Sequence, residues 1–131
     1  MRPGRPAHLA VKAALSIYNC SAVSVGDGDT FRCLGDVRPI APDVTAWVPK
    51  VRLAGVNTPE RGQPGWEEAR ERLREWLERG PFNLICYGRD KYGRLLADAE
   101  RGTGLLSRYM LEAPGTRPVA VANLLTTEEV V

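Results

Sequence analysis

Apolar residues recur at helical spacing in one stretch of the chain, residues 65–81 (GWEEARERLREWLERGP). Five apolar side chains fall on one face of a helix with 3.6 residues per turn: Trp66, Ala69, Leu73, Trp76 and Leu77. Pro64 precedes this pattern, and Gly80 and Pro81 end it. The pattern predicts an amphipathic helix whose charged face is exposed to solvent and is not a binding site.

Runs rich in apolar, β-branched and aromatic residues predict strands elsewhere. They cover residues 16–25, 30–37, 50–56, 82–88 and 93–101. The Asp-Gly turn between the first two runs indicates a β-hairpin. Three prolines favour a loop or irregular edge over residues 38–50. Residues 104–115 have the spacing of a second, short helix, and residues 116–131 are either a further strand or a loose surface segment.

This order of elements predicts an α+β domain, mainly β, in which helices pack on a small barrel-like sheet. The chain of 131 residues is long enough for one domain with its own core. We expect residues 17–131 to form that domain. We expect residues 1–16 to be an N-terminal extension that need not be ordered.

Charge and hydropathy exclude few function classes. The net charge is only +2, so any binding to nucleic acid must come from where the arginines lie. No apolar run approaches membrane-spanning length. Lys12, Ser16 and Asn19 interrupt the weak apolar patch near the start, unlike a signal peptide. This favours a cytoplasmic protein, with a secreted or periplasmic location as the alternative.

The three cysteines fit neither a disulfide framework nor a metal quartet. Cys20 and Cys33 flank the predicted hairpin turn almost symmetrically and could form a disulfide. The alternative is a pair of half-buried thiols in a reducing compartment. Cys86 is most simply a core residue.

The stretch GDGDT, residues 26–30, places Asp29 just past the hairpin turn, where a strand begins. A plain turn explains Asp27 on its own. An EF-hand loop starting there is excluded, because Phe31 and Arg38 would occupy positions that require oxygen ligands. Asp29 can instead direct its carboxylate towards a neighbouring strand.

The stretch RLAGVNTPER, residues 52–61, groups four polar residues behind a short apolar run. The Asn57 side-chain oxygen and the Thr58 carbonyl oxygen are hard donors that suit Ca²⁺ together with an aspartate, and Glu60 can reach the same site. The alternative is a capped loop in which Arg52 pairs with a carboxylate.

The stretch RDKYGR, residues 89–94, offers two cations and an aromatic hydroxyl within one turn: Lys91, Arg94 and Tyr92. This mixture suits a phosphate with a base or sugar beside it, although basic turns are common. Taken together, the three stretches supply carboxylates, a metal site and two arginines. In-line attack of water on a phosphodiester needs these groups.

The motifs VGDGDTFRC, VRLAGVNTPE and DKYGRLLA, in this order, resemble the thermonuclease (staphylococcal nuclease-like) family over roughly residues 17–118. The resemblance implies an OB-fold five-stranded barrel with two helices packed on it. It implies a monomeric Ca²⁺-dependent phosphodiesterase of endonuclease type, acting on single- or double-stranded DNA and RNA.

The resemblance also assigns roles to individual residues. It implies metal binding by Asp29, Thr58 and the position of Asn57. It implies phosphate or transition-state contacts by Arg52 and Arg94. Glu60 would orient or deprotonate the attacking water, and Lys91 and Tyr92 would lie along the nucleotide.

Asn57 departs from the family pattern, which has an aspartate at this position. An amide oxygen can coordinate Ca²⁺, but the loss of one negative charge should weaken metal binding. The alternative to an active enzyme is therefore a catalytically impaired OB-fold module that binds nucleic acid. The presence of Arg52, Glu60 and Arg94 together favours the enzyme.

Overall fold

The computed structural model describes residues 15–36 and 49–126. Within these ranges the elements are β1 (Leu15–Val25), β2 (Thr30–Asp36), β3 (Lys50–Leu53), β4 (Val56–Asn57), α1 (Trp66–Glu78), β5 (Phe82–Arg89), β6 (Leu95–Arg101), β7 (Gly104–Leu105), α2 (Leu106–Met110), β8 (Arg117–Pro118) and α3 (Val121–Leu124). Most of the expected N-terminal extension and most of the proline-rich loop lie outside the described residues.

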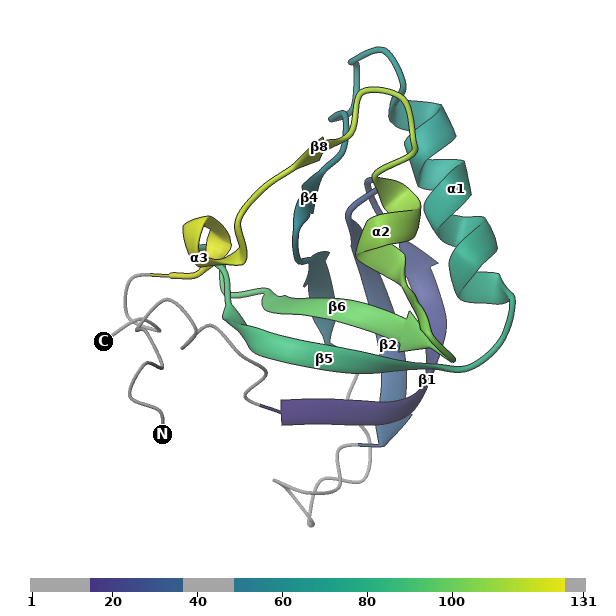
Figure 1. Cartoon of the computed structure of the whole chain (residues 1–131), viewed down its shortest axis with the longest axis vertical. Coiled ribbons are helices and arrows are strands. Elements are labelled where there is room, and N and C mark those ends of the chain that lie inside the picture. Colours follow the sequence, from purple (N-terminus) through teal and green to yellow (C-terminus); the bar gives the residue numbers. More distant parts are fainter. Residues whose placement is uncertain (1–14, 37–48, 127–131) are drawn as a thin grey trace.

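Five strands are joined in a ring by their pairings, in the order β3-β2-β1-β5-β6 and back to β3 (Figure 1). The closing pair, β3 with β6, is parallel and short, from Val51 opposite Leu95 to Leu53 opposite Ala97. The ring is therefore only partly closed. The predicted OB-like, mainly β fold is confirmed, with an incomplete barrel in place of a full one.

The core lies between the sheet and α1. Ala69, Leu73, Trp76 and Leu77 of α1 are buried, as their helical spacing predicts. Trp76 and Phe31 both contact the Phe82 ring, with ring centroids 5.8 and 6.1 Å from that of Phe82. The predicted second helix is present as α2, which lies against α1 and β6 (Figure 1). No helix among the described residues is long and apolar enough to cross a membrane.

A segment that we call the strap, residues 115–125, runs along the open side of the ring (Figure 1). It begins against β4, where β8 pairs antiparallel and the Val119 N–H donates to the Gly55 carbonyl oxygen. It ends at the β5–β6 turn, where Leu125 forms a bridge with Asp90. The strap contains a short strand and the four-residue helix α3. A strand is one of the two alternatives that the sequence offers for this segment, whereas the helix is not predicted.

All three cysteines are buried as thiols. A hydrogen bond with Cys20 and burial raise the pKa of Cys33. Burial, with a smaller effect of Cys20, raises the pKa of Cys86 to about 12. Of the two alternatives for Cys20 and Cys33, the structure has the one without a disulfide.

Candidate active site

The strand β3 brings the three candidate stretches together. Arg52 lies opposite Thr30, the first residue of β2, and opposite Leu96 near the start of β6. The hairpin turn that carries Asp29 and the turn that carries Arg94 therefore flank Arg52. The Leu53 N–H fixes this arrangement by donating to the Asp29 carbonyl oxygen at 2.7 Å.

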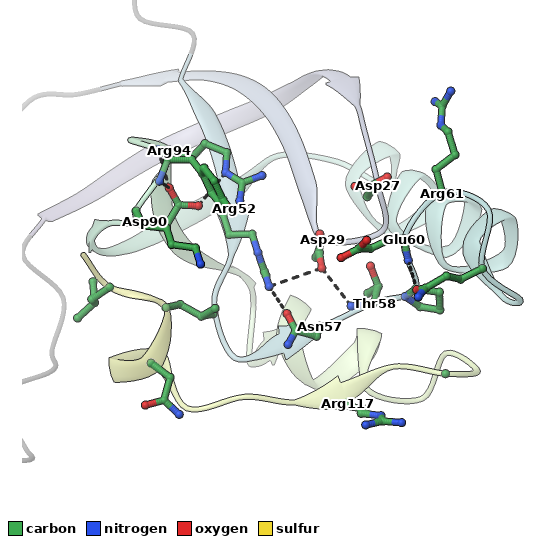
Figure 2. Close-up of a pocket in the computed structure, with 18 of the residues that line it drawn as sticks. Asp27, Asp29, Arg52, Asn57, Thr58, Glu60, Arg61, Asp90, Arg94 and Arg117 are labelled. Atoms are coloured by element: carbon green, nitrogen blue, oxygen red, sulfur yellow. Dashed lines mark hydrogen bonds and ion pairs between the residues drawn. The ribbon is translucent and has the colours of Figure 1, made fainter. Parts of the chain in front are cut away.

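One pocket of about 1020 Å³ opens at this end of β3 (Figure 2). All eight residues that the sequence singles out line it: Asp29, Arg52, Asn57, Thr58, Glu60, Lys91, Tyr92 and Arg94. They come from the β1–β2 turn, from β3, from β4 and the loop after it, and from the β5–β6 turn. Residues that lie far apart in the chain thus line one pocket.

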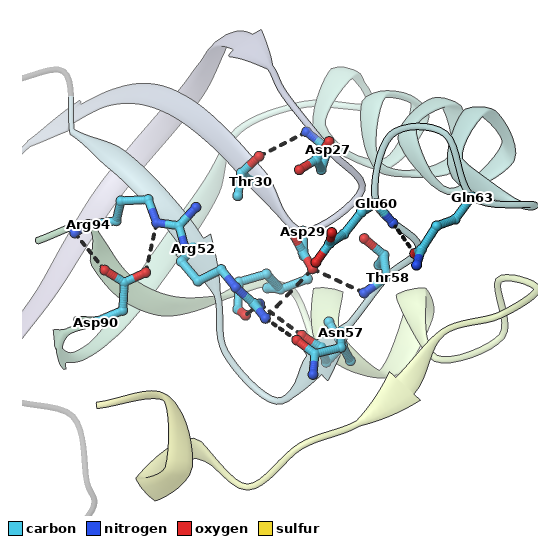
Figure 3. Close-up of polar contacts among 12 residues, drawn as sticks. Asp27, Asp29, Thr30, Arg52, Asn57, Thr58, Glu60, Gln63, Asp90 and Arg94 are labelled. Carbon is cyan, nitrogen blue, oxygen red and sulfur yellow. Dashed lines mark hydrogen bonds and ion pairs between the residues drawn. The ribbon is translucent and has the colours of Figure 1, made fainter. Parts of the chain in front are cut away.

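The Arg52 guanidinium is buried and bonded on two sides. One terminal nitrogen donates to the carbonyl oxygens of Leu53 and Val56, and the other donates to Asn57 Oδ1 (Figure 3). The second nitrogen also lies 3.7 Å from Asp29 Oδ2. Burial lowers the pKa of Arg52, and the Asp29 charge opposes this. Arg52 thus has the carboxylate pairing that the sequence left as the alternative, and it also lines the pocket in which a phosphate contact is expected of it.

Asp29 is held in place by the backbone. Its Oδ2 accepts the Thr58 N–H at 3.0 Å, which ties the hairpin turn to the loop after β4. The close approach requires the glycine at position 28, because an added Cβ there would lie 2.7 Å from Ala69 Cβ and 3.0 Å from Thr58 Oγ1. A larger residue would push the turn, and Asp29 with it, away from the loop.

The Glu60 side chain is exposed and points towards Asp29 (Figure 3). The Glu60 N–H donates to Gln63 Oε1 at 2.7 Å, and the Gln63 N–H donates back to the Glu60 carbonyl oxygen at 2.9 Å. This reciprocal pair fixes the backbone of the loop. Among the described residues, no side chain bonds the Glu60 carboxylate, so it is open to solvent and to a ligand.

Asp90 orients Arg94. Asp90 Oδ2 accepts from Arg94 Nε at 2.7 Å, and Oδ1 accepts the N–H groups of Tyr92 and Arg94. Asp90 is buried, and this contact leaves both terminal nitrogens of Arg94 without a hydrogen-bond partner among the described residues. Arg52 and Arg94 line the same pocket, and the Arg94 charge also lowers the pKa of Arg52.

Tyr92 and Lys91 form the outer rim of the pocket. The Tyr92 side chain is 72% exposed, which is unusual for an aromatic ring. Lys91 Nζ lies 5.4 Å and Arg94 Cζ 5.1 Å from the centre of this ring. The rim therefore offers a ring face and positive charge together, a combination that stacks on bases and attracts phosphate.

The pocket offers oxygen donors to a hard cation, but few of them. Within the described part of the chain no group of three or more His, Cys, Asp and Glu side chains could hold a metal ion. The carboxylates of Asp29 and Glu60 face one another, and Thr58 Oγ1 is buried without a hydrogen-bond partner among the described residues. Asn57 Oδ1 is already bonded by Arg52. This set fits Ca²⁺, which accepts oxygen ligands in flexible geometry, better than a metal that needs nitrogen or sulfur ligands.

Sequence reasoning missed Asp90 and Arg117 as pocket residues. Asp90 precedes Arg94 by four residues across a turn, and an aspartate at the start of a turn commonly bonds the backbone beyond it. That signal could have identified it. Arg117 carries no local signal, because its place depends on the pairing of β8 with the distant β4.

Two comparisons with known proteins relate this chain to nucleases. The family model described as staphylococcal nuclease homologue matches residues 50–113. That segment contains every predicted site residue except Asp29. An uncharacterized endonuclease of Haemophilus influenzae is 31% identical over 78 residues, which are 60% of this chain and 39% of that protein. The chain thus spans well under half of the relative's length.

Proposed function

Residues 50–113 belong to the staphylococcal nuclease homologue family, and on that premise we propose that the protein is a Ca²⁺-dependent nuclease that hydrolyses phosphodiester bonds in DNA and RNA. The proposal also draws on the relative in Haemophilus influenzae, whose name is that of an endonuclease. All of the proposed site residues come from one chain, so a monomer would carry a complete site.

One observation carries the proposal, namely that two arginines and a glutamate line the same pocket from opposite sides. Figure 2 shows Arg52 and Arg94 on one side of Asp29 and Glu60 on the other. A phosphodiester between them would meet cations at its non-bridging oxygens. It would also meet a carboxylate on the side from which water attacks.

Glu60 would act as the general base. Its exposed carboxylate can hold a water and accept a proton as the water oxygen bonds to phosphorus. The bond from phosphorus to the leaving oxygen then breaks, and the electron pair stays with that oxygen. The reciprocal hydrogen bonds between Glu60 and Gln63 fix the backbone from which this carboxylate projects before substrate binds.

The arginines would stabilise the charge that builds on the phosphate oxygens. Arg52 is fixed by its bonds to the loop, so little reorganisation accompanies the reaction. Arg94 is held through Nε and presents its two terminal nitrogens to the pocket. Lys91 and Tyr92 would contact the nucleotide at the rim.

Ca²⁺, held by Asp29 and Thr58 with Glu60 and Asn57 beside them, would act as a Lewis acid on a phosphate oxygen. The backbone bond from Thr58 to Asp29 sets the separation of these donors before the ion binds.

A nucleic-acid-binding module without hydrolysis remains the second candidate. The observation that favours it is the hydrogen bond from Arg52 to Asn57 Oδ1, which occupies the oxygen that the metal would share. A pure binder would have no use for a glutamate at the position of Glu60, which is why we put the nuclease first.

Degradation of single-stranded DNA and RNA, with Ca²⁺ or with a chelator, tests the proposed function. We expect cleavage only with Ca²⁺, and we expect Glu60→Gln to lower kcat by about 100-fold or more. Glu75→Gln is the matched control, because Glu75 is exposed on α1 and lies outside the pocket. If the wild type binds oligonucleotide and does not cleave it, the result would establish the second candidate, a nucleic-acid-binding module without hydrolysis.

A further inference from the structure

Arg117 lines the pocket, although nothing in the catalytic scheme uses it. It lies on β8 directly opposite Asn57 of β4. Side chains of directly opposite residues in an antiparallel pair lie on the same face. Because Asn57 bonds Arg52 on the pocket face, Arg117 projects from that same face, on the strap side of Asn57 (Figure 2).

Arg117 differs from the other pocket arginines in its bonding. Arg52 is bonded to the loop, Arg94 to Asp90, and the Arg61 guanidinium lies 4.8 Å from the Trp66 ring centre. Arg117 is exposed and has no ion pair, hydrogen bond or ring contact with the described residues. Asp29 and three other carboxylates line the same pocket, but none of them pairs with it. Its guanidinium is therefore available to an anion from outside.

We propose that Arg117 binds the phosphate of a nucleotide next to the one being cleaved. The inference rests on the proposed function, and it adds a second phosphate contact on the polynucleotide, outside the position of the bond being cleaved. The scissile phosphate would lie between Arg52 and Arg94, and Asn57 separates that position from Arg117. A chain leaving the pocket along the strap would bring its next phosphate to Arg117.

The chemistry of this contact predicts how binding depends on the length and base sequence of the substrate and on salt. A guanidinium donates hydrogen bonds to two oxygens of a phosphate in bidentate fashion, whatever base the nucleotide carries. Arg117 would therefore increase the affinity for longer oligonucleotides without adding a preference for any base sequence. Because the contact displaces a condensed counterion, it would also make binding more sensitive to salt.

Oligonucleotide binding measured in a chelator tests this inference apart from cleavage. Fluorescence anisotropy with a labelled dinucleotide and a labelled 12-mer of about equal base content would be recorded over a range of salt. We expect Arg117→Gln to weaken 12-mer binding by about fivefold and dinucleotide binding much less. We expect the slope of log affinity against log salt for the 12-mer to fall by about 0.7, the value for one phosphate contact on a single strand.

Two further variants sharpen the test. Arg117→Lys keeps the charge, so it should keep most of the salt slope while losing bidentate geometry. Arg32→Gln removes an exposed arginine of β2 that lies outside the pocket, so it controls for net charge. Equal effects of Arg32→Gln and Arg117→Gln would overturn the inference, as would equal loss with both oligonucleotides or absence of binding by the wild type.

Cleavage assays on the same proteins separate the two proposals. If the wild type binds the 12-mer through Arg117 and cleaves nothing with Ca²⁺, the proposed function fails and the phosphate contact stands. If it cleaves and Arg117→Gln binds and cleaves the 12-mer as the wild type does, the phosphate contact fails and the nuclease stands.

Discussion

The Arg52 guanidinium holds the loop after β3 in place, in addition to the phosphate contact proposed for it. Its bonds to the carbonyl oxygens of Leu53 and Val56 hold the chain reversal between β3 and β4. With Asn57 Oδ1 and Asp29 beside it, most of its donors are occupied within the protein. A buried cation that is bonded in this way cannot swing towards a ligand. Under the proposed function, Arg52 would therefore offer phosphate a fixed charge in a fixed place.

Asn57→Asp restores a carboxylate beside Asp29 and in contact with Arg52. We expect this variant to bind Ca²⁺ about tenfold more tightly, a difference of about 1.4 kcal/mol, because ligand charge increases affinity for the ion. Isothermal titration calorimetry measures the change. Asn83→Asp is the control, since Asn83 Oδ1 accepts the Asn19 N–H outside the pocket and an aspartate can do the same. Unchanged affinity would mean that residue 57 does not face the ion.

Arg94→Gln tests the transition-state role. We expect kcat to fall by about 100-fold or more with little change in substrate affinity, because the terminal nitrogens of Arg94 meet charge that builds only during reaction. Steady-state kinetics and oligonucleotide binding measure the two quantities separately. Asp90→Asn should give a smaller fall in kcat, since it loosens Arg94 without removing it. Equal losses in kcat and in affinity would assign Arg94 to binding alone.

Short motifs are enough to predict which residues share the pocket. Asp29, Asn57 and Arg94 lie in stretches whose turns and spacing can be read directly, and the structure brings all three to one pocket. The bonding between them could not be read in the same way. The hydrogen bond from Arg52 to Asn57, for example, depends on how the loop after β3 folds back.

Among the elements, the junction of β6 with α2 depends on Asp98. This buried carboxylate accepts the N–H groups of Ala99 and Ser107 through Oδ1, and the Ser107 hydroxyl through Oδ2. It thereby satisfies an N–H in the first turn of α2, where no helical carbonyl can do so. The position of α2 against the sheet follows from this contact.

Burial raises the pKa of Asp98, and the hydrogen bonds from Ser107 and Ala99 oppose it only in part. A raised folded-state pKa favours folding most when the group is protonated. This contribution is complete below the unfolded-state pKa, about 3.9, and is lost as the pH rises through the folded-state value. Asp98→Asn keeps the acceptor for both N–H groups and removes the charge.

We therefore expect the free energy of unfolding of the wild type, relative to Asp98→Asn, to increase as the pH falls from about 7 to about 4. Urea unfolding at several pH values measures this difference. The same comparison with Glu75→Gln, an exposed carboxylate, should show no such trend. A difference that is constant with pH would contradict the role given to burial.

The type of an element, helix or strand, can be predicted from the sequence more readily than the element with which it pairs. The apolar face of α1 and the apolar run of β5 depend on near neighbours, and both elements form where the sequence predicts them. For the strap, the sequence offered a further strand as one of two alternatives, but it could not predict the pairing with β4, because β8 has only two residues, Arg117 and Pro118. A strand that short has no periodicity of its own.

At the scale of the whole molecule, the sheet and α1 enclose the thiols. The thiolate is the reactive form of cysteine, and the raised pKa values of Cys33 and Cys86 keep it scarce. We expect a thiol reagent such as dithionitrobenzoate to react slowly with the native protein. After unfolding without reductant it should titrate all three cysteines. A count of one would establish a disulfide between Cys20 and Cys33.

The pairing of β8 with β4 also determines when the pocket is finished as the chain is made. Synthesis proceeds from the N-terminus, so Asn57 leaves the ribosome well before Lys91, and Arg117 follows last. Until Arg117 lies opposite Asn57, the strap side of the pocket has no wall. For a nuclease, this order would mean that the growing chain lacks the proposed phosphate contact of Arg117, and so binds polynucleotide less tightly, while it is still next to the RNA of the ribosome and its message.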